Sequence, residues 1–323
     1  MLPLYDAHNH YHDAWLALHR ARVFADLQSI GVGRAVVNGT CEADWADVAA
    51  LAREFPVVLP SYGLHPWDAG NRSADWQKNL LAALDASASS APGRPTVASA
   101  KVGEIGLDRW ILDRARPDDP RLAGLRRAPL AEQTEVFAWQ LELAASRNLP
   151  ASIHCLDAFG PLHDLLRGAK LPARGFLLHA YSGSEEMMKL FADLGAYFSF
   201  NGSFLPSTPL KPVCHLLGDK YVFRTLSAEG LCNPIGDIRP KHLRRLAVFR
   251  DIPAERLLVE TDAPAMRLPA SLEKFSLPPA DDGSLPNHPA NLAVTYAALA
   301  ELRGVPLESL VAQVEKNFLR FFG

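Results

Sequence analysis

The sequence predicts a (β/α)₈ barrel, and three observations support this fold class. Short apolar runs rich in β-branched residues alternate with helical patterns eight times along the chain. Polar side chains fall at or just after the C-terminal ends of most of these runs. Three segments too long for ordinary connections, Asp108–Ala128, Gly202–Pro240 and Pro264–Pro289, each follow a predicted strand rather than a helix. Because the C-terminal strand ends of an α/β barrel meet at one mouth, all three observations place a site there.

We expect the eight strands at Leu2–His10, Arg34–Gly39, Val57–Leu64, Thr96–Ile105, Ala151–Cys155, Gly175–His179, Ala196–Asn201 and Arg256–Thr261. The clearest helix is expected over Leu130–Arg147, where apolar residues recur at helical spacing and Asn148 and Pro150 follow. An open doubly wound sheet would give the same alternation. Closure is favoured because an open sheet would spread the polar strand ends along an edge too wide for one site. We therefore expect one α/β barrel domain over residues 1–323.

Composition sets limits on partners and compartment. The formal net charge of −3 gives no general attraction for nucleic acid or for an anionic membrane, so a polyanion would need a local basic patch. The four cysteines form no CxxC pair, and neither a signal peptide nor an apolar run of membrane-spanning length is evident. We expect a cytoplasmic protein with free thiols and no membrane association, and no obligate protein partner is evident. Cys214, His215 and Cys232 could form a zinc site, although three dispersed candidates without a fourth are more often coincidence.

The first strand carries the segment DAHNH, in which Asp6, His8 and His10 alternate. Alternate residues of a strand share a face, and two imidazoles on a stiff strand are suitable ligands for a metal such as Zn²⁺. The alternative is a surface strand that happens to carry histidines. Asp6 lies one step deeper in the barrel, so we expect it to orient its neighbours rather than to bind a metal.

The fourth strand places Glu104 between two glycines. A buried carboxylate there needs a cation, either a metal or the side chain of Lys101. We favour the metal, because the two oxygens of Glu104 can bridge two ions. No lysine lies at a strand end where it could form a carbamate bridge, so Glu104 takes that role.

The fifth and sixth predicted strands end in His154 and His179. One such histidine is more often a hydrogen-bonded core residue than a ligand. Two at equivalent positions of adjacent strands, in a chain with 11 histidines, favour metal binding.

The last strand ends in Glu260 and Asp262, which share a face. Strands 1 and 8 are neighbours in a closed barrel, so both carboxylates should point toward the strand 1 histidines. Asp262 could instead cap a helix, but Pro264 follows at once and no helix start is evident. We therefore expect Asp262 to bind a metal and to accept the proton of an attacking water, with Glu260 behind it supporting the ligands.

Four histidines and two carboxylates are enough ligands for two divalent ions. Two ions suit displacement at phosphorus, and either can lower the pKa of a bound water to about 7. In this scheme Asp262 and Glu104 are the catalytic residues, as general base and bridging ligand. Histidine-rich ligation suits Zn, Mn or Co.

The segment after strand 4 contains six arginines, Arg109, Arg114, Arg116, Arg121, Arg126 and Arg127, against three aspartates. Trp67 and Trp110 lie just beyond strand ends, where they could stack on bases. With Arg109, they would make a substrate-binding rim. The alternative, slightly favoured, is a solvated and partly self-paired loop with the tryptophans packed on the rim.

Six motifs in order resemble the TatD-like metal-dependent deoxyribonucleases, which are amidohydrolase-type TIM barrels. They are DAHNH, GLHPW (Gly63–Trp67), VGEIGLD (Val102–Asp108), the single His154, His179 followed by YSG, and ETDAP (Glu260–Pro264). NHPANL and KNFLRFF resemble the closing helices, so the resemblance covers the whole chain. It implies phosphodiester hydrolysis, metal ligation by His8, His10, Glu104, His154, His179 and Asp262, and a place for His65 near the substrate phosphate. It also implies that several different divalent metals can serve, Mg among them.

The chain departs from the family pattern at two cationic positions and in one connection. Leu156 stands where the family usually has a basic residue after the histidine, and no arginine precedes the Asn287 motif. Gly202–Pro240 is longer than the usual connection. The expected function is divalent-metal-dependent cleavage of DNA, at single strands or ends. The alternatives are an amidohydrolase-type enzyme for a small ester, amide or phosphate, and a non-catalytic barrel with a structural metal.

Overall fold

The computed structural model describes residues 2–88, 99–207, 225–226, 232–233, 240–280 and 283–323. Eight parallel strands form one sheet in chain order. They are β1 (Leu4–Asn9), β2 (Val32–Asn38), β3 (Val58–Tyr62), β4 (Lys101–Asp108), β5 (Ala151–Leu156), β6 (Phe176–Leu178), β7 (Ala196–Asn201) and β10 (Leu257–Glu260). Two short strands, β8 (Thr225–Leu226) and β9 (Cys232–Asn233), pair antiparallel outside this sheet.

The sheet closes between its first and last strands. The His10 amide donates to the Ala263 carbonyl at 2.8 Å, and the Asp262 amide donates to the His8 carbonyl at 3.0 Å. The predicted α/β barrel is therefore confirmed, and the open-sheet alternative is excluded. This closure also places β1, which carries the histidines, next to β10, which leads to the carboxylates.

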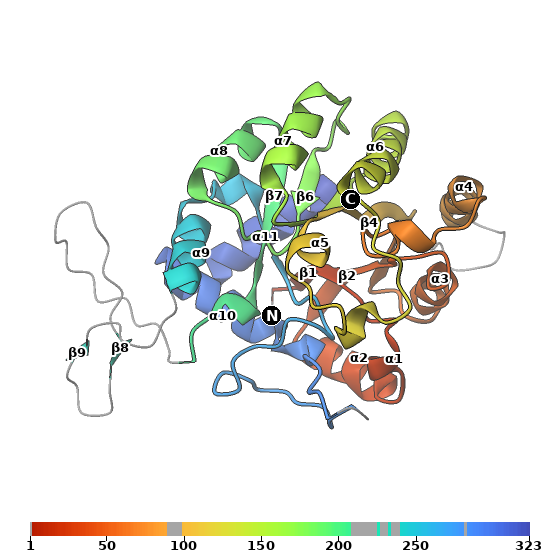
Figure 1. The fold of residues 1–323 in the computed structure, drawn as a ribbon. Coiled ribbons are helices and arrows are strands. Elements are labelled where there is room, and N and C mark those ends of the chain that lie inside the picture. The colour runs from red at the N-terminus through yellow and green to blue at the C-terminus, as the bar shows by residue number, and fades with distance from the viewer. Residues whose placement is uncertain (1, 89–98, 208–224, 227–231, 234–239, 281–282) are drawn as a thin grey trace.

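Helices surround the strands (Figure 1). They are α1 (Ala14–Ala17), α2 (Arg20–Ser29), α3 (Trp45–Glu54), α4 (Trp76–Ala88), α5 (Trp110–Asp113), α6 (Leu130–Arg147), α7 (Phe159–Gly168), α8 (Glu185–Asp193), α9 (Pro240–Asp251), α10 (Leu292–Arg303) and α11 (Leu307–Phe322). The described residues also form five short 3₁₀ helices, η1 (Ala69–Asn71), η2 (Pro120–Leu122), η3 (Gly202–Phe204), η4 (Ala254–Arg256) and η5 (Pro289–Asn291). No helix in the described ranges is long and apolar enough to span a membrane.

The helix predicted over Leu130–Arg147 has those bounds in the structure. Asn148 ends it in the left-handed conformation with φ 50°, which asparagine tolerates better than most residues. Its buried residues recur at helical spacing and face the barrel, as the apolar stripe predicted.

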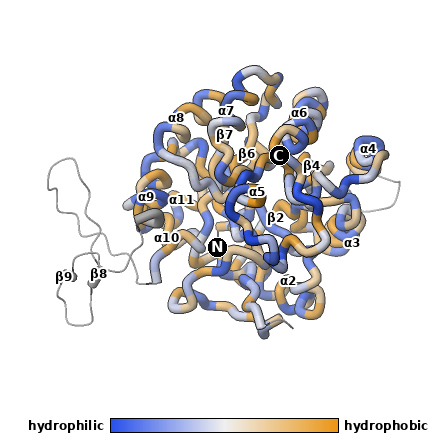
Figure 2. The backbone as a smooth tube through the Cα atoms, viewed as in Figure 1, coloured by the Kyte–Doolittle hydropathy of each residue, from blue (hydrophilic) through white to orange (hydrophobic). Residues whose placement is uncertain are grey.

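Alternation along β1 separates the barrel interior from the helical layer. The Tyr5 ring packs on Phe318 of α11 with centroids 4.7 Å apart, and the Tyr5 carbonyl accepts from the Tyr296 hydroxyl of α10 at 2.9 Å. Asp6 and His8 have the opposite orientation, and both are fully buried. Apolar and polar residues alternate along the helices (Figure 2), and the buried apolar residues of the strands and helices form a core cluster, so the wall that carries the site residues is itself well packed.

Strand β4 differs most from its predicted bounds. It was expected over Thr96–Ile105, but it begins at Lys101 and runs on to Asp108. Residues 89–98 are outside the described ranges. Glu104 therefore lies in the middle of the strand rather than at its end, and Asp108 occupies the strand end instead.

Candidate metal centre

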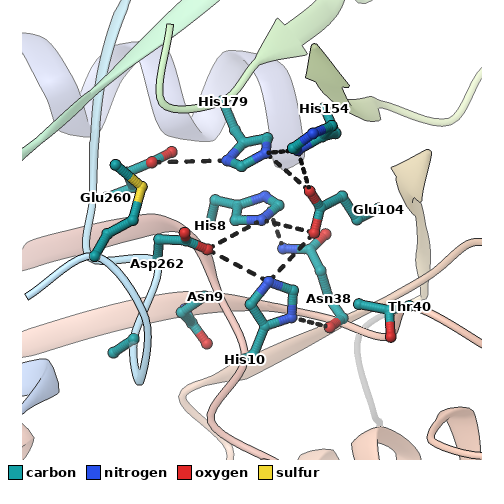
Figure 3. A network of polar contacts seen from close by, with 12 residues as sticks. His8, Asn9, His10, Asn38, Thr40, Glu104, His154, His179, Glu260 and Asp262 are labelled. Carbon is teal, nitrogen blue, oxygen red and sulfur yellow. Dashed lines mark hydrogen bonds and ion pairs between the residues drawn. The ribbon is translucent and has the colours of Figure 1, made fainter. Parts of the chain in front are cut away.

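Glu104 is at the centre of the site, and its two oxygens are divided between five histidines of the described residues, four of which are labelled in Figure 3. Oε2 lies 3.3 Å from Nε2 of His8 and 3.2 Å from Nε2 of His10. Oε1 lies near the other three, 3.3 Å from Nε2 of His65, 3.1 Å from Nδ1 of His154 and 2.9 Å from Nε2 of His179. Each oxygen thus belongs to one half of the cluster, which is the arrangement that a bridging ligand requires.

Within the described ranges, three groups of side chains have ligand atoms, one from each residue, that lie within 4.8 Å of one another. They are His8, His10 and Asp262; His8, Glu104 and His179; and His65, Glu104 and His154. All six predicted ligands are in these groups, and so is His65. Imidazole nitrogens with carboxylate oxygens are a donor set for divalent transition metals.

The β1 histidines are held through their Nδ1 atoms, which leaves Nε2 facing the centre. Nδ1 of His8 lies 2.8 Å from the Ser152 hydroxyl, and Nδ1 of His10 lies 2.8 Å from the Asn38 carbonyl. Nε2 of His8 is buried and makes no hydrogen bond. A buried nitrogen without a hydrogen bond, aimed at a carboxylate and at other imidazoles, fits metal binding better than it fits a structural role.

Asp262 completes the half of the site formed by β1. Its Oδ1 lies 3.4 Å from Nε2 of His10 and 3.7 Å from Nε2 of His8. Asp262 has a φ of 51°, and the residue before it is fixed by Asp6. The Asp6 carboxylate accepts from the Thr261 amide at 3.0 Å and from the Thr261 hydroxyl at 2.6 Å. Asp6 therefore positions the Asp262 segment and does not face the cluster, which is how the sequence places it.

Glu260 has a different orientation from the one predicted. Its Oε1 lies 3.7 Å from Nδ1 of His179 and accepts from the Asn201 amide at 3.2 Å. Glu260 and Asn201 are register partners on β10 and β7, so Glu260 packs on the β7 side and not toward the β1 histidines. It contacts the back of one candidate ligand, as expected for a supporting residue, but the ligand is His179.

Asp108 is a site residue that the sequence analysis did not single out. Its Oδ2 lies 3.1 Å from Nε2 of His154 and accepts from Nε1 of Trp67 at 2.6 Å. This contact turns Nδ1 of His154 toward Glu104. A carboxylate behind a histidine ligand fixes the ring and raises its basicity. The signal was present, because Glu104, Gly106 and Asp108 alternate along one strand face.

His65 lies deeper than the resemblance implied. It is buried, with 8% of its surface exposed, and Nε2 is within reach of Glu104. It therefore lies among the candidate metal ligands instead of at an outer phosphate position. Spacing alone could not distinguish these roles, since His65 follows β3 by three residues.

Electrostatics divide the cluster into anionic carboxylates and imidazoles. Burial raises the pKa of Glu104, but the surrounding histidines hold it well below its usual range. Burial also opposes charge on His10, yet Asp262 and Glu104 raise the pKa of His10 well above its usual value. Burial and neighbouring His179 lower the pKa of His8. Two ionised carboxylates among crowded imidazoles make a site that attracts a cation.

The cluster opens into a cavity of about 370 Å³, a size typical of ligand sites. Its walls include Trp67 after β3, Leu156 at the end of β5, Phe204 in η3 and Arg245 in α9. Thus one residue of the predicted rim, Trp67, does line the cavity.

The arginines of the segment after β4 bind nearby carboxylates or backbone carbonyls, and none of them is among the described lining residues of this cavity. Arg109 lies 3.1 Å from Asp113, Arg121 lies 2.7 Å from Asp119, Arg126 lies 2.6 Å from Glu132, and Arg127 donates to backbone carbonyls. Trp110 stacks on Trp67 with ring centroids 6.0 Å apart, and the Arg121 guanidinium carbon lies 4.7 Å from the Trp110 centroid and 5.8 Å from the Trp67 centroid. This is the geometry of the self-paired loop, the alternative favoured from the sequence.

Two further sequence-based alternatives concern Lys101 and the cysteines. Lys101 makes no ion pair with Glu104 among the described residues. Lys101 is the first residue of β4, three positions before Glu104. Cys41 and Cys155 are free thiols. The side chains of Cys214, His215 and Cys232 are outside the described part of the chain.

Comparisons with known proteins agree on the family. The family model described as TatD related DNase matches residues 5–323. The 3′-5′ ssDNA/RNA exonuclease TatD of Citrobacter koseri is 30% identical over 91% of this chain and 88% of its own length, and that of Escherichia coli K12 is 28% identical over 95% and 94%. The uncharacterized metal-dependent hydrolase YjjV of Escherichia coli K12 is 26% identical over 90% of this chain and 87% of its own.

Solved structures agree on the fold. The crystal structure of the TatD homologue YjjV from Escherichia coli K12 superposes with a TM-score of 0.72 at 24% identity, covering 99% of this chain and 97% of the other. A TatD family hydrolase from Entamoeba histolytica gives 0.69 at 15% identity, covering 99% and 98%.

Proposed function

This chain belongs to the TatD-related DNase family, and we propose that it is a divalent-metal-dependent exonuclease of single-stranded nucleic acid. The observation that carries the proposal is Glu104, whose two oxygens face two separate groups of candidate ligands at the mouth of the barrel. Curated relatives over most of the chain are named 3′-5′ ssDNA/RNA exonucleases, which supports the same substrate and polarity here.

We propose that two ions bind, one among His8, His10 and Asp262 and one among His65, His154 and His179, with Glu104 shared. The ions, Zn, Mn, Co or Mg, would supply Lewis acidity and lower the pKa of a bound water. The chain's own residues do the rest. Glu104 holds the two halves together, while Asp262 accepts a proton from the attacking water, since its Oδ1 faces the cavity beside the β1 histidines.

Residues behind the ligands keep this geometry fixed. Asp6 holds Thr261 and so orients Asp262, Asp108 orients His154, and Glu260 contacts His179. Trp67, on the cavity wall, offers a surface for the terminal base. We also propose that the protein acts in the cytoplasm.

A metal panel with labelled substrates tests the proposal. Metal-free protein supplied with Mg²⁺, Mn²⁺, Zn²⁺ or Co²⁺ should shorten a 5′-labelled single-stranded oligonucleotide stepwise from its 3′ end. Blunt duplex should be cleaved more slowly, and EDTA and Asp262→Ala should each abolish cleavage. Hydrolysis of a small ester or amide, with no cleavage of any nucleic acid under any metal, would show that the substrate class is wrong while the metal centre is right.

A further inference from the structure

The cavity above the metal centre has a single Lys or Arg among its described lining residues, Arg245 of α9. The lining acids are Asp68, Glu104 and Asp262. A nucleic-acid strand brings several negative charges to this mouth, and the arginines after β4 are paired elsewhere. Apart from the metals, Arg245 is therefore the candidate for a cationic contact to that strand.

Arg245 lies against an aromatic ring, and within the described part of the chain its N–H groups make no hydrogen bond. Its guanidinium carbon lies 4.9 Å from the centroid of the Phe204 ring. Phe204 is 1% exposed and packs on Phe249 and Phe200, with centroids 5.9 and 6.1 Å away, so the platform is rigid. Stacking uses the face of a guanidinium, and its N–H groups in the plane stay free to donate.

No carboxylate among the described residues lies within 4 Å of the Arg245 guanidinium, in contrast to five of the six arginines after β4. Burial lowers the pKa of Arg245 and the charge of Asp157 opposes this, but the Asp157 carboxylate itself lies 3.4 Å from Arg114. Arg245 is nevertheless partly buried. A partly buried guanidinium without a counter-ion is a costly arrangement, and an anionic ligand would remove that cost.

Barrel topology places Arg245 across the mouth from Trp67. Phe204, its platform, follows β7, whereas Trp67 follows β3, and these strands are four places apart in an eight-stranded closed order. Arg245 also makes no ion pair with Glu104 or Asp262, so it stands to one side of the metal ligands. A strand bound across the mouth with its terminal base at Trp67 and its scissile phosphate at the centre would bring its next phosphate to the side of β7.

We propose that Arg245 binds the phosphate next to the scissile one through its free guanidinium edge. This inference rests on the proposed function. Arginine matches phosphate geometry with two parallel N–H···O bonds, which gives both affinity and register. Arg245 thus determines specificity for a strand over a substrate with one phosphate, and it takes no part in the chemical step.

Arg245→Gln tests the inference against two substrates. For a single-stranded oligonucleotide we expect KM to rise about tenfold or more, with kcat changed by less than about threefold, and the salt dependence of binding to lose about one phosphate contact. For bis(p-nitrophenyl) phosphate, which has one phosphate, both constants should stay within about twofold. Arg245→Lys should restore part of the affinity. Arg244→Gln is the matched control, because Arg244 is the exposed neighbour on the same helix.

The outcomes separate the inference from the proposed function. If the wild type cleaves the oligonucleotide and Arg245→Gln matches it, or if both substrates lose equally, the phosphate contact is refuted while the nuclease stands. If the wild type cleaves no nucleic acid, the proposed function fails and this inference falls with it. Metal content and melting temperature equal to the wild type show that the variant is folded.

Discussion

Glu104→Gln is the variant that tests the bridging arrangement most directly. The substitution keeps the shape of a side chain that is 3% exposed and removes its charge. Because Oε1 serves three histidines and Oε2 serves two, both halves of the centre should lose metal together. Asp262→Asn should weaken only the half formed by His8 and His10. The loss of metal affinity in Glu104→Gln should exceed the 10–100-fold loss that typically follows substitution of a residue behind a metal ligand.

The expected magnitude follows from linkage between binding and folding. A metal supplied at about 100 times its Kd stabilises the folded state by about 2.7 kcal/mol per site. Two sites therefore contribute about 5 kcal/mol, which raises the melting temperature by roughly 10 °C for a chain of this size. Glu104→Gln should show almost none of this shift, and Asp262→Asn about half.

Metal titration by calorimetry, followed by thermal unfolding with and without metal, measures both quantities. Glu142→Gln is the matched control, since it makes the same change at an exposed carboxylate of α6 that is not among the candidate ligands. Two ions bound by Glu104→Gln with wild-type affinity would refute the shared carboxylate. Loss of one ion only would assign Glu104 to a single site and refute the bridge.

Two further predictions concern buried charges near the centre. Burial and the charge of Arg174 lower the pKa of Lys101 to about 8. Protonated Lys101 therefore destabilises the folded state below that pH, and the free energy of unfolding of the wild type should rise between pH 8 and about 10. Lys101→Met should raise the free energy of unfolding at pH 7 by up to about 3 kcal/mol, and no gain in a urea titration would contradict this. Burial disfavours charge on His154, yet the Asp108 carboxylate helps to raise the pKa of His154 to about 9, so metal affinity should increase with pH up to that value. Asp108→Asn should lower metal affinity 10–100-fold at high pH, and the affinity of this variant should stop increasing at a lower pH than that of the wild type. Calorimetry over a pH series measures both effects.

Much of the centre could be predicted from the sequence because it is built on regular strands. Alternation places Asp6, His8 and His10 on one face, and parallel topology brings the C-terminal ends of β5 and β6 to the same mouth as β1. The closure of β10 on β1 then brings Asp262 to the β1 histidines, as expected. These inferences need only the period of a strand and the order of strands in a closed barrel.

What the sequence analysis missed depends on details that period does not fix. The extension of β4 to Asp108 moved Glu104 to mid-strand and gave His154 a carboxylate behind it. Glu260 faces His179 because β10 has a neighbour on each side, and alternation alone does not say which one a side chain contacts. His65 lies beyond the end of β3, where the path of the chain and not strand geometry sets its direction.

Arg245 could not be found by spacing, because nothing local distinguishes it from Arg244 beside it. Its role follows from packing: α9 returns along the barrel so that one arginine stacks on Phe204 above the cavity. Leu156, where the family pattern has a basic residue, also lines this cavity, and no Arg or Lys of β5 is among the described lining residues. The loop after β4 does not replace it, since its arginines are paired. Arg245, the one Arg or Lys among the described lining residues, lies on the β7 side. We therefore expect a bound strand to run from Trp67 across the metal centre to Arg245, with the phosphate contact relocated instead of removed.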